Sequence, residues 1–417
     1  MSLPTRNILM IAFHYPPLQE GSGIYRTTGF EKHLPNHGWT PHILTAHPRV
    51  HKNYVKPLTK PAPHVHYTLA LDTAKHLAWR GKYLKLFALP DRWASWWFSA
   101  IPQGLYLIKK IKPQVIWSSY PIATSHLIAL TLHKLTGIPW IADFRDPMTD
   151  DTHPYDPLTR CSFRWIEHKT FKTSQACVFT TEGTFKLYQQ RYPHICQKNW
   201  QVIENGYEES HFPAQTDTWF EKSIPSEPPI VLLHSGHVYP IERNPNVFLQ
   251  TLAQLKASHR INKNQIKIIF RGIDPQHYLN EYIKKLNLGD IVELKPSISH
   301  EDAIHEILNA HGLIILQANN CNHQIPAKAY EYLRANKPIL ALTDHQGDTA
   351  NLLRPFDHCY IADLTSGNEI EEQLTQLIGD IQSQTFHQTD LAPITQLSRQ
   401  YRTEALASLL GRLTQTS

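Results

Sequence analysis

Residues 325–340 read IPAKAYEYLRANKPIL, a helical pattern that runs directly into a short apolar strand. Pro326 suits the first turn of a helix, where a missing N–H is tolerated. Lys328 and Glu331 follow three residues apart, so they lie on one side of the helix. Two interpretations are open at this point: an ion pair that steadies the helix by a few tenths of a kcal/mol, or an anion site at a helix N-terminus to which Lys328 adds charge.

The same alternation of short apolar runs and longer helical patterns extends along the whole chain, which is typical of βαβ units and a parallel sheet. It predicts an α/β fold with two Rossmann-like domains. The predicted strands of the first half are Ile8–Phe13, His42–Thr45, Val115–Ser118, Trp140–Asp143 and Cys177–Thr180. Those of the second half are Ile230–His234, Ile266–Phe270, Ile291–Leu294, Leu313–Leu316 and Pro338–Leu342.

A polar, proline-containing stretch separates the two halves. We expect a first domain over 1–205, a linker over 206–228, a second domain over 229–390, and a C-terminal helical segment over 391–417 that packs back on the first domain. Ligands of such folds bind at the carboxyl ends of the strands. Two domains facing each other would therefore enclose one cleft, and polar residues just after strands are the candidates for binding.

Composition narrows the class of protein. Of 417 residues, 41% are apolar and 18% charged, as in an ordered globular chain, and the formal charge of +5 does not indicate a nucleic-acid partner. Five cysteines without a C-x-x-C pair argue for a reducing compartment and against a disulfide framework or structural zinc. No apolar run approaches 18 residues, so we expect a cytoplasmic protein that at most sits on the inner face of the plasma membrane.

In the first half, Gly21 and Gly23 lie in a loop before a helix, where exposed N–H groups favour an anion. The dinucleotide fingerprint fails because Arg26 stands where its third glycine would be. An ordinary flexible loop is the alternative.

The sequence WIADFRDP places Asp143, Arg145 and Asp146 just past a strand, where they could orient hydroxyls or act as acid and base. A salt-bridged turn is the alternative. His126, at the start of the preceding helix, is a further candidate, although a lone helical histidine is more often structural.

In the second half, the strand ending at His234 is followed by Ser235 and Gly236, and Arg243 precedes the next helix. An arginine here could bind a phosphate through two parallel hydrogen bonds, or it could be an ordinary surface residue. Arg271 ends the next strand in a similar way. The histidines of HEDAIHE are five residues apart, which does not fit H-E-x-x-H, so we predict no metal site.

The stretch 75–112 is basic and aromatic. Eight lysines and arginines accompany a single acid, Asp91, and the tryptophans are Trp79, Trp93, Trp96 and Trp97. Such a composition suits an anionic membrane surface. Core aromatics with a solvated basic rim are the alternative.

Five segments, in order and spanning nearly the whole chain, resemble family-4-like glycosyltransferases of the GT-B fold, in the branch for cell-surface polysaccharide synthesis. They are ILMIAFHYPPLQEGSGIYRTTGFEKHLPNHGWTPHILT, SSYPIATSHLIALTLHKLTGIPWIADFRDP, VIENGYEESHF, LLHSGHVYPIERNP and IPAKAYEYLRANKPIL. The pattern departs at His323, where many members carry the first glutamate of E-x7-E.

The resemblance implies transfer of a sugar from a nucleotide-diphosphate sugar, such as a UDP-sugar, to an acceptor hydroxyl on a glycan, lipid-linked saccharide or small molecule. It also implies retention of configuration and no required cofactor. The second domain would hold the donor and the first the acceptor. Combined with the candidates found from their position after strands and at helix starts, the expected catalytic residues are Arg243, Lys328 and Asp143. The expected donor-binding residues are Gly21, Gly23, Ser235, Gly236, Arg243, Arg271, Lys328 and Glu331, and the expected acceptor-binding residues are His126, Arg145 and Asp146.

Two other functions stay open. One is a sugar-nucleotide epimerase of the same fold. The other is a non-catalytic protein that binds nucleotide sugars, an interpretation that His323 alone supports.

Overall fold

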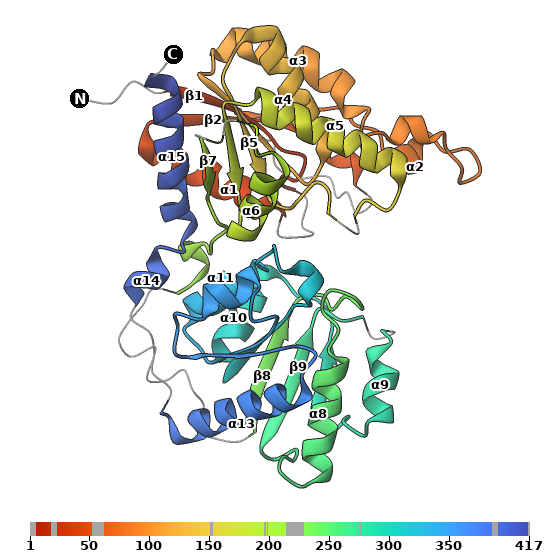
Figure 1. Ribbon diagram of the computed structural model, residues 1–417, viewed down its shortest axis with the longest axis vertical. Helices are drawn as coiled ribbons and strands as arrows, with labels where there is room; N and C mark the ends of the chain where they lie inside the picture. The colour runs from red at the N-terminus through yellow and green to blue at the C-terminus, as the bar shows by residue number, and fades with distance from the viewer. Residues whose placement is uncertain are drawn as a thin grey trace. The chain divides into compact units, whose positions relative to one another are not determined.

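The computed structural model describes residues 6–17, 23–51, 62–150, 153–195, 197, 199–213, 229–274, 277–385 and 391–415. The chain folds into two compact units. Unit 1 comprises Met1–Asn205 and Arg399–Ser417, and unit 2 comprises Gly206–Ser398 (Figure 1). The C-terminal helix therefore belongs with the first half of the chain, although it follows the whole second half in sequence.

Unit 1 contains a seven-stranded parallel sheet in the order β3-β2-β1-β4-β5-β6-β7. Its strands are β1 (Arg6–Ile11), β2 (Trp39–Ala46), β3 (Val65–Thr68), β4 (Val115–Ser119), β5 (Trp140–Phe144), β6 (Ala176–Phe179) and β7 (Trp200–Val202). The strand order reverses between β1 and β4, and this switch point is where doubly wound sheets bind ligands.

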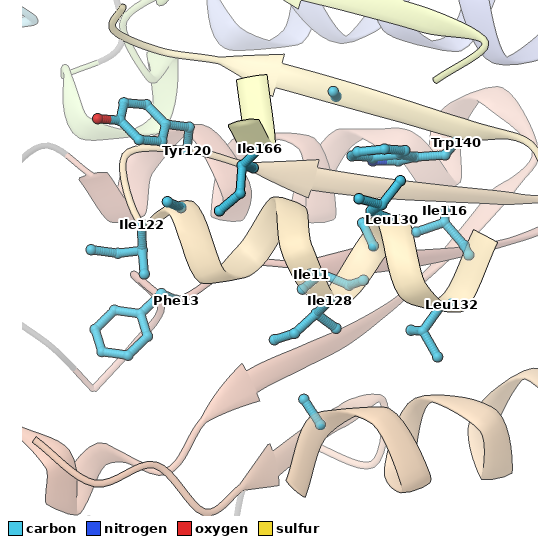
Figure 2. Close-up of a cluster of buried hydrophobic side chains, with 14 of the residues drawn as sticks. Ile11, Phe13, Ile116, Tyr120, Ile122, Ile128, Leu130, Leu132, Trp140 and Ile166 are labelled. Atoms are coloured by element: carbon cyan, nitrogen blue, oxygen red, sulfur yellow. The ribbon is translucent and has the colours of Figure 1, made fainter. Parts of the chain in front are cut away.

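Helices cover both faces of this sheet. The longer ones are α1 (Gly23–His33), α3 (Trp96–Ile111), α4 (Ala123–Thr136), α5 (Pro157–Thr173), α6 (Glu182–Arg191) and α15 (Arg399–Gln415), with a short α2 (Thr73–His76). One core layer lies between the sheet and α3, α4 and α5 (Figure 2). The other lies between the sheet and α1 and α15, where Phe30 packs near Leu406 and Leu410.

Unit 2 repeats the arrangement with a six-stranded parallel sheet in the order β10-β9-β8-β11-β12-β13. Its strands are β8 (Ile230–Ser235), β9 (Ile266–Arg271), β10 (Val292–Lys295), β11 (Gly312–Leu316), β12 (Ile339–Leu342) and β13 (Cys359–Ala362). The switch point lies between β8 and β11. Its helices are α8 (Asn246–Ala257), α9 (Leu279–Lys285), α10 (His300–Asn309), α11 (Lys328–Ala335), α12 (Asp348–Leu353), α13 (Gly367–Ser383) and α14 (Leu391–Thr395).

Local sequence explains where several helices begin and end. Asp156 caps α5 by accepting a hydrogen bond from the Thr159 N–H, and Pro157 takes the first helical position. Gly137 ends α4 with a φ of 73°, a left-handed conformation that glycine adopts without strain. The α/β prediction is confirmed, and all ten predicted strands are present.

Candidate functional site

At the carboxyl end of β8, the ammonium group of Lys328 lies beside a buried histidine. Lys328 Nζ is 3.2 Å from His234 Nε2, and His234 Nδ1 is 3.0 Å from the Ile314 carbonyl oxygen on β11. Because Nδ1–H donates to that carbonyl, Nε2 is left to accept from Lys328. His234 has no exposed surface. The contact bridges β8, β11 and α11, which places Lys328 at the switch point of the sheet.

Gly236 makes room for this lysine. A Cβ at Gly236 would lie 2.9 Å from Lys328 Nζ, and its φ of 125° is one that L-residues rarely adopt. The requirement for glycine after His234-Ser235 is therefore both steric and conformational. The neighbouring Ser235 N–H donates a 2.9 Å hydrogen bond to the Tyr332 hydroxyl of α11, which fixes the strand end to the helix.

The positive charge of Arg243 interacts electrostatically with the side chain of Lys328. Burial lowers the pKa of Lys328 well below its usual value, and the positive charge of Arg243 lowers it further, whereas Glu331 raises it. Arg243 is oriented by a 3.2 Å hydrogen bond from Nη1 to the His237 carbonyl, and its guanidinium lies 5.2 Å from the Tyr239 ring centroid. Lys328, which is partly buried, and Arg243 therefore lie near enough to interact electrostatically, and together they can supply positive charge to an anion.

Glu331 lies one turn along α11 from Lys328. Its carboxylate is 3.5 Å from His300 Nε2 on α10, and that nitrogen is 3.1 Å from His211 Nδ1. The side chain of Glu331 retains 12% exposure, so it is partly accessible to a ligand. The opposite-charge pair in the sequence is therefore not a simple intrahelical bridge, since each member also has a partner from another element.

Arg271 is occupied by structural contacts. Its guanidinium makes two hydrogen bonds to the Glu306 carboxylate, at 2.8 and 2.6 Å, and one of 2.9 Å to the Pro296 carbonyl. These bonds tie β9 to α10. Because all three guanidinium nitrogens of Arg271 already donate hydrogen bonds to protein oxygens, Arg271 is a poor candidate for binding a phosphate. The donor site proposed below therefore does not include it.

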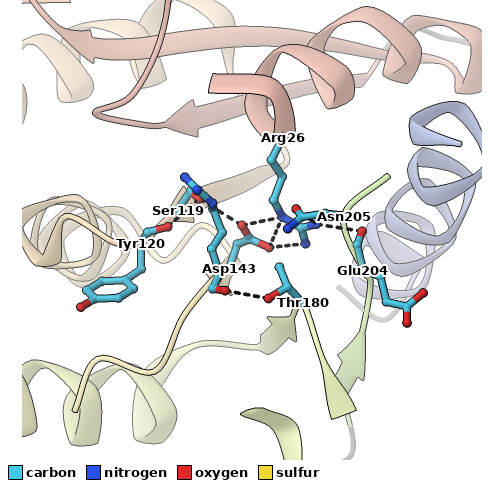
Figure 3. Close-up of polar contacts among 8 residues, drawn as sticks. Arg26, Ser119, Tyr120, Asp143, Thr180, Glu204 and Asn205 are labelled. Atoms are coloured by element: carbon cyan, nitrogen blue, oxygen red, sulfur yellow. Dashed lines mark hydrogen bonds and ion pairs between the residues drawn. The ribbon is translucent and has the colours of Figure 1, made fainter. Parts of the chain in front are cut away.

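In unit 1, Arg26 neutralises the carboxylate of Asp143 (Figure 3). Arg26 has one signal in the sequence, namely that it stands where the dinucleotide fingerprint would have its third glycine. Arg26 Nη2 and Nε lie 2.6 and 2.9 Å from the Asp143 carboxylate oxygens, and Ser119 Oγ donates to the same carboxylate at 3.0 Å. Arg26 Nη1 also donates to the Glu204 carbonyl at 3.0 Å. Asp143 has no exposed surface, so it joins α1, β5 and the end of β7 and does not face solvent.

Arg145 and Asp146 follow Asp143 at the same sheet edge. Arg145 Nη1 donates a 3.1 Å hydrogen bond to the Gly23 carbonyl at the start of α1. Burial raises the pKa of Asp146, although Arg145 and His153 oppose the rise, and burial with the Arg145 charge lowers the pKa of His14 to about 3. This edge therefore brings Gly23, Arg145 and Asp146 together. Gly21 lies outside the described residues.

His126 is placed in the core. It has no exposed surface, its Nδ1 is 2.8 Å from Ser118 Oγ, and its ring lies 4.8 Å from the ring of Phe144. A side chain in this position cannot touch an acceptor without rearrangement of the sheet and α4. We therefore leave His126 out of the proposed acceptor site.

The buried position of His126 predicts a pH-dependent contribution to the stability of the fold. Burial lowers the pKa of the His126 imidazole from 6.5 to about 3. Below pH 6.5, this imidazole therefore binds a proton in the unfolded chain but not in the folded chain. The contribution of His126 to the free energy of unfolding should then fall by about 1.4 kcal/mol per pH unit. Urea unfolding of wild type and His126→Gln at pH 7 and pH 5 measures this. The stability difference between the two proteins should shrink by roughly 2 kcal/mol, and a difference that is the same at both pH values would contradict it.

Among the described residues, no three His, Cys, Asp or Glu side chains gather in a way that could hold a metal ion. In the same part of the chain, no helix is both long and apolar enough to cross a membrane.

Comparisons with known proteins give the fold of the whole chain and a family match for part of it. Three solved structures, between 12% and 14% identical in sequence, cover almost the whole chain. Sucrose-phosphate synthase from Thermosynechococcus elongatus is 14% identical with a TM-score of 0.65, covering 99% of this chain and 98% of its own. Anabaena HepE, solved with UDP and glucose, is 12% identical with a TM-score of 0.61, covering 98% and 100%.

The third structure is WaaG, a glycosyltransferase involved in lipopolysaccharide biosynthesis, at 12% identity and a TM-score of 0.59, covering 98% of this chain and 99% of its own. No curated protein sequence matches the chain significantly. Residues 215–385, which lie within unit 2 and include Arg243, Lys328 and Glu331, match the family model for glycosyl transferases group 1. This family match covers the second half of the chain, and the solved structures show that the whole chain shares their fold of two Rossmann-like sheets in the GT-B manner.

Proposed function

We propose that unit 2 binds a nucleotide-diphosphate sugar, with the diphosphate on Lys328 and Arg243 and the nucleotide ribose on Glu331. The observation that carries this is the pair of cationic side chains at the β8/β11 switch point, one of them partly buried beside His234. A partly buried ammonium beside a second cation is costly unless an anion completes the site. The structure of HepE with UDP and glucose supports a UDP-sugar as the donor.

The chemistry proposed is substitution at the anomeric carbon. The bond from that carbon to the phosphate oxygen breaks, a new bond to the acceptor oxygen forms, and the acceptor proton leaves with the phosphate or to solvent. The transition state resembles an oxocarbenium ion, and negative charge grows on the departing diphosphate. Lys328, Arg243 and the N–H groups at the start of α11 would stabilise that charge. Retention of configuration is implied by family resemblance alone.

Several residues receive supporting roles. Gly236 leaves space for Lys328, Ser235 fixes β8 to α11, and His234 positions the ammonium group through a hydrogen bond. In unit 1 we propose Gly23, Arg145 and Asp146 for the acceptor, because they lie at the carboxyl edge of the sheet and Asp146 is partly exposed. Asp143 is proposed as a structural residue, since Arg26 and Ser119 occupy its oxygens.

The acceptor class we propose is a glycan or a lipid-linked saccharide in cell-surface polysaccharide synthesis. A lipid-linked acceptor would be reached at a membrane surface, and we propose that part of 75–112 contacts that surface. The function of WaaG in lipopolysaccharide biosynthesis supports this acceptor class.

A thermal-shift screen followed by transfer assays tests the function. UDP-sugars should raise the melting temperature, because a ligand at 100 times its Kd stabilises the native state by about 2.7 kcal/mol. The stabilising donor should then label a glycan or lipid extract from membranes. An epimerised donor formed without any acceptor would indicate the epimerase instead, and binding with no transfer to any acceptor would indicate a non-catalytic binding protein.

A further inference from the structure

The basic, aromatic stretch of unit 1 divides into two parts with different environments. Trp96 is fully buried, and its Nε1 donates to Thr68 Oγ1 at 2.8 Å. Trp97 donates to Thr131 Oγ1 at 3.0 Å, and it packs with Trp93 against the core layer of α3 and α4. These three tryptophans are structural. Trp79, in contrast, is 79% exposed.

Trp79 belongs to a short projecting segment, residues 77–87, which we name the Trp79 tip (the orange segment beyond α2 in Figure 1). Six of its eleven residues are large, apolar and at least 40% exposed: Leu77, Trp79, Tyr83, Leu84, Leu86 and Phe87. Soluble chains expose single apolar residues routinely, but a run of this density marks an interaction surface.

The backbone of the tip is ordered by its own hydrogen bonds. Trp79 and Lys82 exchange backbone hydrogen bonds of 2.7 and 3.0 Å across Arg80 and Gly81. Both turn residues have left-handed φ, 50° and 77°, the pattern of a two-residue hairpin turn. The turn therefore presents Trp79 outward from a defined loop and does not leave it in a random coil.

The base of the tip is fixed to unit 1. Thr73 Oγ1 donates to the Phe87 carbonyl at 2.8 Å, and the Thr73 N–H donates to the Arg92 carbonyl at 2.9 Å. Asp72 caps α2 and forms an ion pair with Arg92 at 2.5 Å. The exposed apolar side chains are thus carried by an anchored projection, so their exposure is not a consequence of an unpacked segment.

The charge of this region has one sign. From Thr73 to Pro90 the sequence contains no Asp or Glu, while Lys75, Arg80, Lys82 and Lys85 are all exposed. Lys85 forms an ion pair with Asp156. Lys75, Arg80 and Lys82 have no ion pair with any described carboxylate. Apolar side chains interleaved with such cations match the boundary between acyl chains and anionic headgroups.

We propose that the Trp79 tip docks unit 1 on an anionic lipid bilayer, with Trp79, Leu84, Leu86 and Phe87 inserted at the headgroup level and Lys75, Arg80 and Lys82 on the lipid phosphates. A second protein would be expected to bring acids to match these cations, and a second copy of the same tip would bring like charge against them. This proposal specifies which part of 75–112 contacts the membrane in the proposed function, and vesicle binding tests it separately from glycosyl transfer.

Flotation with vesicles of phosphatidylcholine and phosphatidylglycerol tests the proposal. Wild type should float with anionic vesicles, less so at high salt, and only weakly with pure phosphatidylcholine. The full-length variant Trp79→Ser/Leu84→Ser/Leu86→Ser should lose at least about tenfold in its partition coefficient, because each removed side chain withdraws buried apolar area. These side chains are exposed, so the melting temperature should stay unchanged.

A matched control is Phe98→Ser/Tyr106→Ser, which removes two aromatics that are 74% and 56% exposed on α3, outside the tip. It should float as wild type does. Equal flotation of wild type and the tip variant would overturn the proposal, as would an equal loss in the control. Loss of a dimer in the tip variant, with no flotation of wild type, would assign the surface to a second copy of the chain and also overturn it.

Discussion

Replacing Lys328 with alanine should lower kcat for sugar transfer by about 10²–10³-fold, the usual cost of removing one group that stabilises charge in a transition state. In the proposed site its ammonium meets the departing diphosphate, and His234 holds it there through a 3.2 Å contact. Arg243→Ala should have a similar effect. The measurement is single-turnover transfer with saturating UDP-sugar, together with donor affinity by calorimetry.

Lys284→Ala is a suitable control because it removes the same charge from an exposed position on α9. It should turn over as wild type does. Gly236→Ala gives an independent check, since its Cβ would displace the ammonium without removing it. If Lys328→Ala and Arg243→Ala both bind donor and transfer at the wild-type rate, the diphosphate lies elsewhere.

The same site predicts proton uptake on donor binding. Burial and Arg243 lower the pKa of Lys328 in the free protein, whereas a bound diphosphate would raise it again. Donor affinity should therefore increase as the pH falls toward the lowered pKa of Lys328 in the free protein. Calorimetry in two buffers of different ionisation enthalpy should detect uptake of a proton on donor binding in wild type and no such uptake in Lys328→Ala.

Periodicity in the sequence predicts most of the strands but misses three that lie at the edges of the two sheets. The predicted strands are mostly apolar runs, as expected for parallel strands that are buried on both faces. The structure adds β3, β7 and β13, whose sequences VHYT, WQV and CYIA are only three or four residues long, and the first two also contain polar residues. The helical pattern near the C-terminus predicts one segment, whereas the structure divides it into α14 and α15 because the chain passes there from unit 2 to unit 1.

The candidate site is less predictable for a physical reason. Position after a strand places a charged residue at the ligand-binding edge, but it does not reveal whether a partner from elsewhere already neutralises that charge. Arg271 is engaged by Glu306, 35 residues away, and Asp143 by Arg26, 117 residues away. Arg26 itself gives one weak signal, because it stands where the third glycine of a dinucleotide fingerprint would be.

Breaking the Arg26–Asp143 pair should destabilise the protein strongly. The side chains are 3% and 0% exposed, and Arg26 donates to both carboxylate oxygens. Asp143→Ala leaves a guanidinium uncompensated in a buried site, which costs about 3–5 kcal/mol. Double replacement, Arg26→Met/Asp143→Leu, should cost much less than Asp143→Ala, because no buried charge is left without a partner.

Urea unfolding of wild type, Arg26→Met, Asp143→Leu and the double variant measures the coupling between the two residues. The pair Lys267–Glu293, 41% exposed on both sides, is the matched control, and Glu293→Ala should cost no more than about 1 kcal/mol. The cycle also separates a structural from a catalytic Asp143. A structural residue predicts that the double variant regains folding and transfers sugar below its melting temperature, since no reacting group has been removed. A stable double variant without activity, or an Asp143→Ala variant as stable as Glu293→Ala, would contradict the structural assignment.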